Sequence, residues 1–431
     1  MICGNNNGQK KNGIHLLINK KNKQTRMNMK HLIIIGDGMA DWHIPSLGGK
    51  TILENAYTPY MNKLAKEGCN GVLQTIPTGL PSGSDVANLS ILGYNPYEVC
   101  DGRGPYEAQG LSINLQADDL ILRCNLVSID NSILKSHSAD YITTEEADIL
   151  IHYLQEYLGN EFVNFYTGKQ YRHLLVIKGG HKDVNCTPPH DIISKSLYAY
   201  LPQAKEPSAK ETARLIQDLI LKSQRILKDH PLNKKRMKNG KMPANSIWPW
   251  GGGYLPQIKP FNSKFPQVKS GAIISAVDLI RGIGHSIGLQ PIEVPGATGN
   301  YKTNYKNKVI ATLDSLQDND FVYLHIEASD ESGHEGDIFL KQRTIEDLDS
   351  QIIGPIYETI KGWNTSVAIA VLPDHATPCE CRSHTTDPVP FFIWHRDIIP
   401  DTVQKFDETS AYNGMYGTLK GDEFINEFMK E

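Results

Sequence analysis

Six side chains able to bind metal follow the ends of three apolar runs in this chain. The runs, at residues 32–35, 321–326 and 367–372, are each typical of a buried strand. The side chains that follow them are Asp37, Asp330, His334, Asp374, His375 and His384. Because the carboxyl ends of parallel strands meet at one edge of a sheet, these carboxylates and imidazoles can converge there. Each alone could be an ordinary turn residue or core histidine, but together they suffice for two divalent ions.

Ser84 is the candidate nucleophile. It follows a glycine turn and precedes a short helical pattern, so its ordinary role would be that of a helix N-cap. The free N–H groups at a helix N-terminus also stabilise an alkoxide or a phosphate. A metal ion ligated by the same oxygen would lower its pKa far enough for nucleophilic attack near neutral pH. The residues alone leave both interpretations open.

The order of these seven residues resembles that of the alkaline phosphatase superfamily, and more closely that of the archaeal-type, 2,3-bisphosphoglycerate-independent phosphoglycerate mutases. Local motifs carry the closer resemblance from about Lys30 to the C-terminus. They are Gly36–Trp42, Gly83–Asp85, Leu92–Tyr97, Gly102–Ala108, Arg123–Asn125, Glu293–Gly299 and Glu327–Asp330. The resemblance implies an α/β fold with an alkaline-phosphatase-like parallel-sheet core that is sandwiched by helices.

The resemblance also implies how the residues act. Two sets of metal ligands are implied, one of Asp330, His334 and His384, and the other of Asp37, Asp374, His375 and the shared Ser84. Ser84 would form a phosphoserine, and the phosphoryl group would then pass to an alcohol on the same glycerate skeleton. The expected reaction interconverts 2- and 3-phosphoglycerate without 2,3-bisphosphoglycerate as a cofactor. Oxygen and imidazole ligands without thiolates favour Mn²⁺ or Zn²⁺ over Mg²⁺.

Three arginines are candidates for binding the substrate, namely Arg103, Arg123 and Arg281. Arg103 lies between glycines, where a planar guanidinium can approach a phosphate or a carboxylate with two hydrogen bonds. It could as easily be a surface arginine, and only the resemblance favours contact with the substrate. The basic run 234–238, in contrast, favours a solvated loop over an anion site.

Two domains are predicted from the length of 431 residues and from a change of pattern along the chain. Residues 29–115 and 266–431 alternate strands and helices, as in a parallel α/β core. In residues 116–265 no candidate metal ligand follows a strand-like run, which favours an inserted α+β lid. Lids of this kind exclude water from phosphoryl-transfer sites. Residues 1–28, rich in Asn, Lys and Gly, predict a disordered extension, or else a true start at Met27 or Met29.

The composition limits the partners and the location. A net charge of −4 with mixed signs gives no reason to expect nucleic acid or an anionic membrane surface as a partner. No apolar run approaches the roughly 20 residues that a membrane span needs. Seven scattered cysteines, an odd number, indicate reduced thiols and a cytoplasmic location. The resemblance leaves a small phosphorylated metabolite as the expected partner.

Three departures from the archaeal pattern leave the substrate open. Residues 136–140 and 250–253 lack the arginines of the archaeal enzymes, and Asn88 replaces a histidine. These replacements resemble a bacterial branch of the family that has been proposed to act as homoserine kinase. Homoserine has an ammonium group that Trp248 or Trp250 could contact, although core packing is the ordinary role of both. The alternatives are therefore a homoserine phosphotransferase, a simple phosphatase and a non-catalytic, metal-stabilised binding protein.

Overall fold

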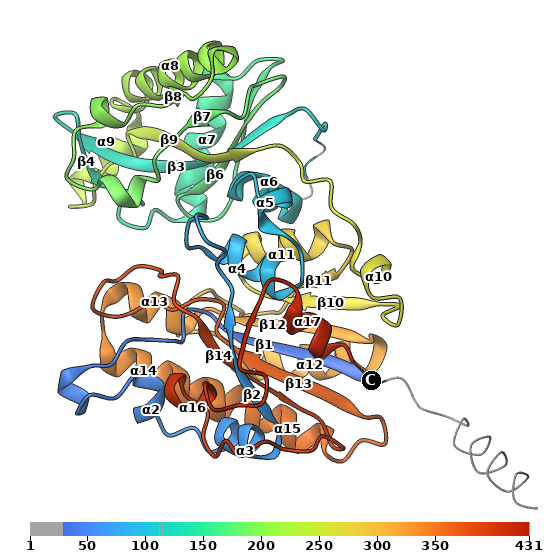
Figure 1. Ribbon diagram of the computed structural model, residues 1–431. Helices are drawn as coiled ribbons and strands as arrows, with labels where there is room; N and C mark the ends of the chain where they lie inside the picture. Colours follow the sequence, from blue (N-terminus) through green and yellow to red (C-terminus); the bar gives the residue numbers. More distant parts are fainter. Residues whose placement is uncertain (1–28, 112, 114, 431) are drawn as a thin grey trace, which may run out of the picture.

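The structure is a computed structural model in which residues 29–111, 113 and 115–430 are described. The expected disordered extension, residues 1–28, lies outside the described residues. Two main β-sheets organise the chain, the larger in the lower part of Figure 1 and the smaller in the upper part. Among the helices of the described residues, none combines the length and the apolar character needed to cross a membrane.

The larger sheet has eight strands in the order β11-β10-β12-β1-β13-β14-β2-β15. Their bounds are β1 (Lys30–Gly36), β2 (Cys69–Gln74), β10 (Gly271–Ile274), β11 (Gln290–Ile292), β12 (Phe321–Ile326), β13 (Val367–Leu372), β14 (Val389–Trp394) and β15 (Thr418–Lys420). Neighbouring strands run parallel, except that β14 is antiparallel to both β13 and β2. The expected α/β core with a largely parallel sheet is confirmed.

The three apolar runs that precede the metal-binding side chains are the adjacent strands β12, β1 and β13. Their ends are level, because Ile35 of β1 pairs with both His325 of β12 and Leu372 of β13. All three strands are buried almost throughout, which explains why their sequences do not alternate between apolar and polar residues. The chain therefore leaves these strands at one level of a single edge.

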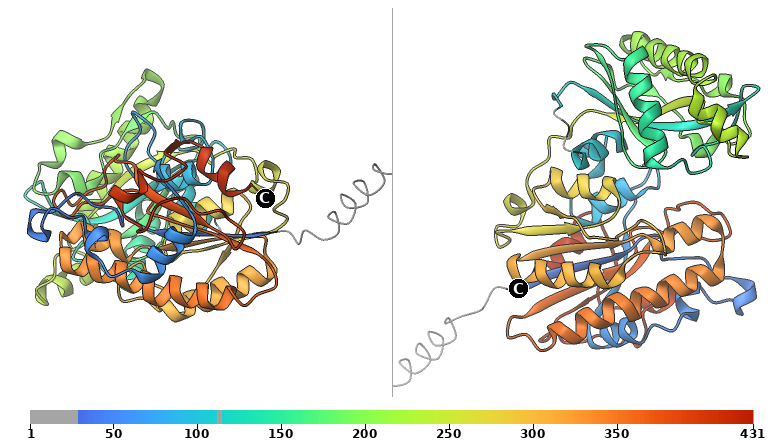
Figure 2. Two further views of the ribbon diagram at one scale, coloured as in Figure 1. Left: turned by 60° about the horizontal axis from the view of Figure 1, so that its bottom comes forward. Right: turned by 180° about the vertical axis from the view of Figure 1, so that it is seen from behind.

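Helices cover both faces of this sheet. Alternate residues of a strand point to opposite faces, so Leu32 and Ile34 of β1 join one core cluster while Ile33 and Ile35 join another. The first cluster includes residues of α3 (Pro59–Glu67), α12 (Tyr305–Asp318), α14 (Ile338–Asp347) and α15 (Gly354–Ile360). The second includes residues of α4 (Ser84–Ile91), α6 (Arg103–Gly110), α11 (Asp278–Ser286) and α17 (Glu423–Phe428). Figure 2 shows the resulting helix layers on both sides of the sheet.

The smaller sheet is antiparallel and lies beyond α6 in Figure 1. Its strands are β3 (Leu120–Asp130), β4 (Ile133–Ser136), β5 (Val163–Tyr166), β6 (Arg172–Ile177) and β9 (Ser246–Gly253). Helices α7 (Thr144–Leu158) and α8 (Lys210–Leu227) share one apolar core with these strands. The division into a core and a lid at residues 116 and 265 stays a prediction.

Strand β9 contains a proline, and helix α9 (Pro231–Lys238) includes a stretch expected to be a loop. Pro249 argues against a central strand, but β9 pairs only with β3 and so lies at an edge, where a proline is tolerated. The loop expected over residues 234–238 is wrong, because these residues end α9. Lys234, Lys235 and Lys238 are exposed as expected, but Arg236 is only 1% exposed. The Arg236 guanidinium binds the Glu146 carboxylate and the Ala139 carbonyl, so its charge is compensated in the interior.

Glu408 makes the stability of the fold depend on pH. Its carboxylate, at the start of α16 (Glu408–Ala411), accepts hydrogen bonds from the Asp41 N–H and the Thr51 hydroxyl. Burial outweighs these bonds and raises the pKa of the Glu408 carboxyl to about 7. A carboxyl with a raised folded pKa stabilises the fold below its unfolded pKa, and this contribution is lost as the pH rises through the folded pKa.

We therefore expect the wild-type protein to lose stability relative to Glu408→Gln as the pH rises. Between about pH 5 and pH 8 the free energy of unfolding should fall by about 2 kcal/mol more in the wild type than in the variant. Urea denaturation at a series of pH values measures the difference. Parallel pH profiles of the two proteins would contradict the raised pKa.

Candidate metal centre and nucleophile

The expected metal-binding side chains lie at the carboxyl edge of β12, β1 and β13. Asp37 follows β1 directly, and Asp374 and His375 lie just after β13. Because these strands are adjacent and level, residues more than 330 positions apart in the chain become neighbours at this edge. The Gly38 N–H, for example, donates to Asp374 Oδ1 at 3.1 Å.

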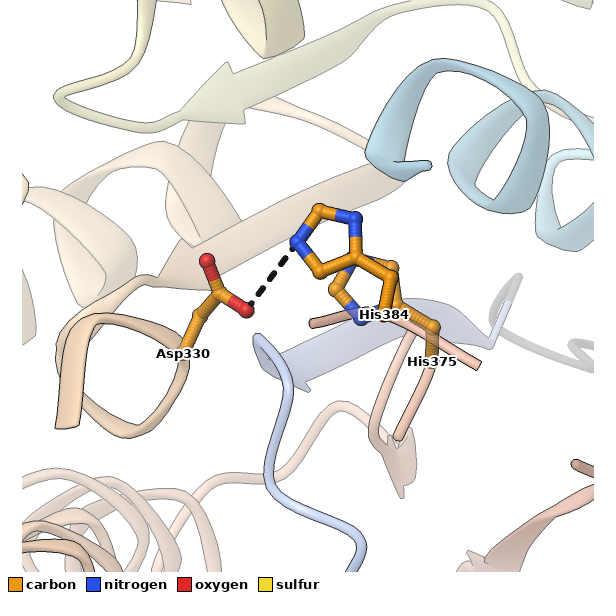
Figure 3. A group of neighbouring side chains, drawn as sticks. All are labelled: Asp330, His375 and His384. Carbon is orange, nitrogen blue, oxygen red and sulfur yellow. Dashed lines mark ion pairs between the residues drawn. The ribbon is translucent and has the colours of Figure 1, made fainter. Parts of the chain in front are cut away.

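Helix α13 (Ala328–Glu335) places Asp330 and His334 one turn apart on one face, which explains their four-residue spacing. Asp330 Oδ2 lies 3.2 Å from His334 Nε2, and Asp330 Oδ1 lies 3.4 Å from His384 Nε2, the contact drawn as a dashed line in Figure 3. The two imidazole nitrogens are 3.0 Å apart. Burial alone would raise the pKa of Asp330, but His384 and His334 lower it well below its usual value. The structure thus brings the first expected ligand set together.

His375, a member of the second expected set, also lies close to residues of the first. Its Nε2 is 3.6 Å from Asp37 Oδ1 and 3.5 Å from Asp374 Oδ2. Its ring stacks on that of His384 with 3.9 Å between the centroids, and Figure 3 shows the two rings side by side near Asp330. The second expected set is therefore also assembled, and it adjoins the first.

A fourth histidine, His325, reaches the second set, and the sequence analysis missed it. Its Nε2 lies 3.3 Å from Asp37 Oδ2, and its side chain is fully buried. It stands inside the apolar run of β12, where a single histidine resembles an ordinary core residue. The signal that could have found it is the period of two in a strand, because His325 and Glu327 are two residues apart and share one side of the run.

Thr377 connects the two sets and orients His375. Its hydroxyl donates to Asp330 Oδ1 at 2.6 Å, so its oxygen is left to accept the Nδ1–H of His375 at 3.2 Å. In this tautomer the lone pair of His375 Nε2 faces Ser84 Oγ, which lies 3.2 Å away. One hydroxyl thus fixes the geometry of ligands in both sets and directs His375 toward the candidate nucleophile.

Ser84 is the first residue of α4, and Gly83 is the N-cap. The N-cap interpretation of Ser84 is therefore wrong, and its hydroxyl is directed to His375 instead of to a backbone N–H. A Cβ atom at Gly83 would lie 2.6 Å from Asp85 Oδ1 and 2.9 Å from the Arg103 guanidinium. Glycine is needed here because the Asp85 and Arg103 side chains come this close to the backbone at the N-terminus of α4.

Asn88, which replaces a histidine of the archaeal pattern, ties the nucleophile to a metal ligand. Its side-chain amide donates to the Ser84 carbonyl at 2.8 Å and to Asp374 Oδ2 at 2.9 Å. The Tyr323 hydroxyl donates to the amide oxygen of Asn88. The amide of Asn88 therefore makes two hydrogen bonds as a donor and one as an acceptor, and it can do so at every pH because it does not titrate.

The charges at this edge fit bound cations. Burial, and then the carboxylates of Asp374 and Asp330, raise the pKa of Asp37 well above its usual value. Asp37 Oδ1 and His325 Nε2 are buried without a hydrogen-bond partner among the described residues. Facing carboxylates and unpartnered imidazole nitrogens are the donor set that divalent Mn²⁺ and Zn²⁺ accept. The residues present therefore fit the expected metal ions.

Arg103 and Arg123 gather around Trp250. Their guanidinium carbons lie 5.7 and 4.9 Å from the centroid of the tryptophan ring. The indole N–H donates to Asn125 Oδ1 at 3.0 Å, which fixes the ring. Arg123 pairs with Glu107 at 3.1 Å, but its buried Nε has no partner within the described part of the chain. Two of the three candidate arginines thus lie together.

The third candidate, Arg281 on α11, has two carboxylate partners. Its guanidinium lies 3.1 Å from Glu293 and 3.9 Å from Asp278. Arg103 and Arg123 have one carboxylate partner each, Asp85 at 3.6 Å and Glu107 at 3.1 Å, so Arg281 differs from them in having two. Its expected role in binding the substrate stays a prediction.

Two histidines, His137 and His190, and a further arginine, Arg172, adjoin the positive cluster of the two arginines beside Trp250, and the sequence analysis missed them. The His190 ring lies 5.4 Å from that of Trp250 and 6.4 Å from that of His137. Burial lowers the pKa of His137, and the charges of Arg123, Arg172 and His334 lower it further. Because His334 belongs to α13, the positive cluster faces the metal-binding edge. These residues follow no motif, so only the folded chain could reveal them.

Comparisons with known proteins identify relatives of nearly the whole chain. The family model of 2,3-bisphosphoglycerate-independent phosphoglycerate mutase matches residues 65–233. A relative from Methanosarcina barkeri named as that mutase is 47% identical over 404 residues, covering 93% of this chain and 100% of the relative. A relative from Geobacter sulfurreducens, named as a probable mutase of this kind, is 42% identical and covers 89% of this chain and 95% of its own length.

Two solved structures share the fold. A protein from Pyrococcus horikoshii is 33% identical, with a TM-score of 0.78 and coverage of 93% of this chain and 97% of the other. The cofactor-independent phosphoglycerate mutase from Thermoplasma acidophilum is 26% identical, with a TM-score of 0.61 and coverage of 93% and 99%. On the strength of curated relatives 41–47% identical along more than 90% of its length, the chain belongs to the family of 2,3-bisphosphoglycerate-independent phosphoglycerate mutases.

Proposed function

We propose that the protein interconverts 2-phosphoglycerate and 3-phosphoglycerate by metal-dependent phosphoryl transfer through Ser84. The observation that carries this proposal is the 3.2 Å contact between Ser84 Oγ and His375 Nε2, at a helix N-terminus beside two groups of metal-binding side chains. The names of the curated relatives give the same activity. The expected family and the expected enzyme class agree with these names.

Ser84 Oγ would attack the phosphorus atom while the bond between phosphorus and the glycerate oxygen breaks. The electron pair of that bond stays on the glycerate oxygen, which takes up a proton in place of the one that the Ser84 hydroxyl loses. The other hydroxyl of the same glycerate then loses its proton and attacks the phosphoserine, the bond between phosphorus and Ser84 Oγ breaks, and Ser84 Oγ is reprotonated. Free N–H groups at the start of α4 would hold the phosphoryl oxygens. Divalent cations at the two ligand sets would neutralise those oxygens and lower the pKa of the Ser84 hydroxyl.

The positive cluster around Trp250 suits a substrate with two anionic groups. Phosphoglycerate carries a phosphate and a carboxylate, and each good charge-assisted contact contributes about 1.5–3 kcal/mol. We assign these contacts to Arg103, Arg123 and Arg172. These arginines come from α6, β3 and β6, and they would replace those absent from residues 136–140 and 250–253.

Residues 116–265 would form the lid that keeps the glycerate intermediate from leaving. A mutase must exclude water during the lifetime of the phosphoserine, because water would convert it into a phosphatase. The positive cluster on the smaller sheet, opposite α13, supports this role. Closure over the substrate would place the cluster on the carboxylate while the phosphate meets Ser84.

Phosphorylation of homoserine is disfavoured by the surroundings of the two tryptophans. Trp248 is 1% exposed and donates to the Thr187 carbonyl, as in ordinary core packing. Trp250 already contacts two guanidinium groups, which would repel the ammonium group of homoserine. The relatives named above also give no support to a homoserine kinase or to a non-catalytic binding protein.

Mn²⁺ or Zn²⁺ is the metal ion that we favour, because the ligands are carboxylates and imidazoles, and Mg²⁺ fits less well. The substrate would be a small phosphorylated metabolite, and we propose no nucleic-acid or membrane partner. A cytoplasmic location is supported by the cysteines, since the six that the structure describes are all free thiols.

A direct comparison of substrates tests the function. The purified protein with Mn²⁺ would receive 3-phosphoglycerate with enolase as the coupling enzyme, and in parallel homoserine with ATP. We expect rapid formation of phosphoenolpyruvate and no phosphohomoserine. Release of inorganic phosphate from 3-phosphoglycerate without mutase turnover would identify a phosphatase instead, and phosphohomoserine would overturn the proposal.

Arg172→Met tests whether the positive cluster binds the substrate. Losing one charge-assisted contact should lower kcat/KM by roughly 10- to 100-fold, mainly through a higher KM for 3-phosphoglycerate. Arg214→Met, an exposed arginine on α8, is the matched control and should leave both constants unchanged. Unchanged kinetics in both variants would remove Arg172 from the site.

A further inference from the structure

His325 directs a buried ring nitrogen toward the second ligand set, and this nitrogen has no hydrogen-bond partner among the described residues. The side chain is 0% exposed, and its Nε2 lies 3.3 Å from Asp37 Oδ2. One ligand atom from each of Asp37, His325 and Asp374 can be chosen so that all three lie within 4.8 Å of one another. Neither His325 Nε2 nor Asp37 Oδ1 has a hydrogen-bond partner among the described residues. A buried site of this kind needs something to occupy it.

The other ring nitrogen of His325 is fully engaged. Its Nδ1 lies 3.2 Å from Glu327 Oε1, and the same oxygen accepts from the Ser275 hydroxyl at 2.8 Å and from the Ala276 N–H at 3.2 Å. Lys308 of α12 pairs with Glu327 Oε2 at 3.2 Å, and both side chains are almost completely buried. A carboxylate held in this way accepts the Nδ1–H of the imidazole. The lone pair of His325 is therefore on Nε2, facing Asp37.

That tautomer is the one a metal-binding histidine needs. Ligating histidines commonly donate their second N–H to a carboxylate, which fixes the ring and makes the ligating nitrogen more basic. In a neutral imidazole without a cation, the Nε2 lone pair would face the negative Asp37 carboxylate, which is repulsive. A cation between the two removes this repulsion, and so would a proton on either the ring or the Asp37 carboxylate.

We propose that His325 is an additional ligand of the cation held by Asp37 and Asp374, and that Glu327 and Lys308 are the positioning residues that fix its ring. The inference rests on the two-metal site of the proposed function. It adds a ligand to the expected second set, which contains only His375 as an imidazole. It also gives a role to the buried Lys308–Glu327 pair, which lies outside the ligand sets themselves.

The hyperfine-shifted ¹H NMR spectrum of the Co²⁺-loaded protein tests this ligation without any substrate. The exchangeable Nδ1–H of a histidine that binds Co²⁺ through Nε2 is strongly shifted by the paramagnetic ion. The Nδ1–H of His325 is buried against Glu327, so it should exchange slowly with water and remain visible. We expect His325→Gln to remove one such signal from the wild-type spectrum and to weaken Co²⁺ binding at one site by at least about 100-fold.

His31→Gln is the matched control. His31 is also a buried histidine of the larger sheet, 2% exposed, but it lies at the opposite end of β1 from Asp37 and packs against Phe428. This variant should lower the stability while leaving the shifted signals and the Co²⁺ stoichiometry unchanged. A wild-type set of shifted signals that persists in His325→Gln would show that His325 is a protonated neighbour of Asp37 and no ligand, which overturns the proposal.

The positioning residues are tested by neutral replacements. Glu327→Gln keeps an oxygen acceptor for His325 but removes its charge, and should move the His325 signal and weaken Co²⁺ binding about 10- to 100-fold. If His325→Gln does not fold, the moved signal in Glu327→Gln still identifies His325 as a ligand, and an unmoved spectrum overturns the proposal. The double variant Lys308→Met, Glu327→Gln removes both buried charges together and should give the same shift as Glu327→Gln alone.

This outcome is separable from that of the proposed function. A Co²⁺-loaded protein with the His325 signal but without phosphoglycerate mutase turnover would retain the ligand assignment and reject the mutase. Full mutase turnover in the wild type, together with an unchanged spectrum in His325→Gln, would retain the mutase and reject the ligand assignment.

Discussion

Replacing Ser84 with alanine should abolish phosphoglycerate mutase turnover, with kcat lower by about 10⁴-fold or more. The proposed chemistry passes through a covalent phosphoserine. Among the described residues, Ser84 is the one whose hydroxyl lies within hydrogen-bond distance of His375 Nε2, at 3.2 Å. The six other expected metal-binding side chains stay in place, so the variant should still bind both cations and the substrate but turn nothing over. Loss of kcat with KM nearly unchanged distinguishes a lost nucleophile from a lost binding contact.

The measurement combines the enolase-coupled assay with acid quenching and peptide mass spectrometry. In the wild type a phosphoryl group should be found on the peptide that contains Ser84, and in Ser84→Ala it should be absent. Ser90→Ala is the matched control, because Ser90 is a buried serine of the same helix whose hydroxyl has no hydrogen-bond partner among the described residues. Near-normal turnover in Ser84→Ala would mean direct transfer between the two hydroxyls of the glycerate.

The sequence predicts the core and most of the site because each ligand is attached to a strong local signal. Unbroken apolar runs are typical of strands that are buried on both faces, and Asp37, Asp374 and Asp330 each follow one. Level ends of adjacent parallel strands then bring the ligands together without further information. The metal-binding edge could therefore be predicted from the type and order of the residues alone.

The rest could not be predicted because it depends on contacts between distant segments. His325 looks like part of an apolar strand, and its role follows only from the approach of Asp37 on β1. Arg172 and His190 lie in stretches without a motif. The pairing of β6 and β9 with β3 brings Arg172 and Trp250 into one sheet, and the His190 ring lies 5.4 Å from that of Trp250. Arg236 belongs to a basic run, and its burial depends on the ion pair with Glu146, a residue 90 positions away in the chain.

Removing the metal ions should inactivate the protein and lower its thermal stability substantially. Ligands that bind only the folded state stabilise it by about 4 kcal/mol for each site at 1,000 times Kd. For two sites in a chain of this length the melting temperature should fall by roughly 10 °C on treatment with EDTA. Differential scanning calorimetry with EDTA and then with added Mn²⁺ measures the loss and its recovery. An unchanged melting temperature would contradict a two-metal site.

The effect of Asp37→Asn on the melting temperature should have opposite signs in the metal-free and the Mn²⁺-loaded protein. This change of sign distinguishes the loss of a metal ligand from a general loss of packing. Without metal, the Asp37 carboxylate is buried and repelled by Asp374 and Asp330, so the neutral amide should raise the melting temperature relative to metal-free wild type. With saturating Mn²⁺ the same substitution removes an anionic ligand and should lower the melting temperature relative to metal-loaded wild type. A substitution that only disturbed packing would lower both. The crossing of the two comparisons is therefore specific to a cation held by Asp37.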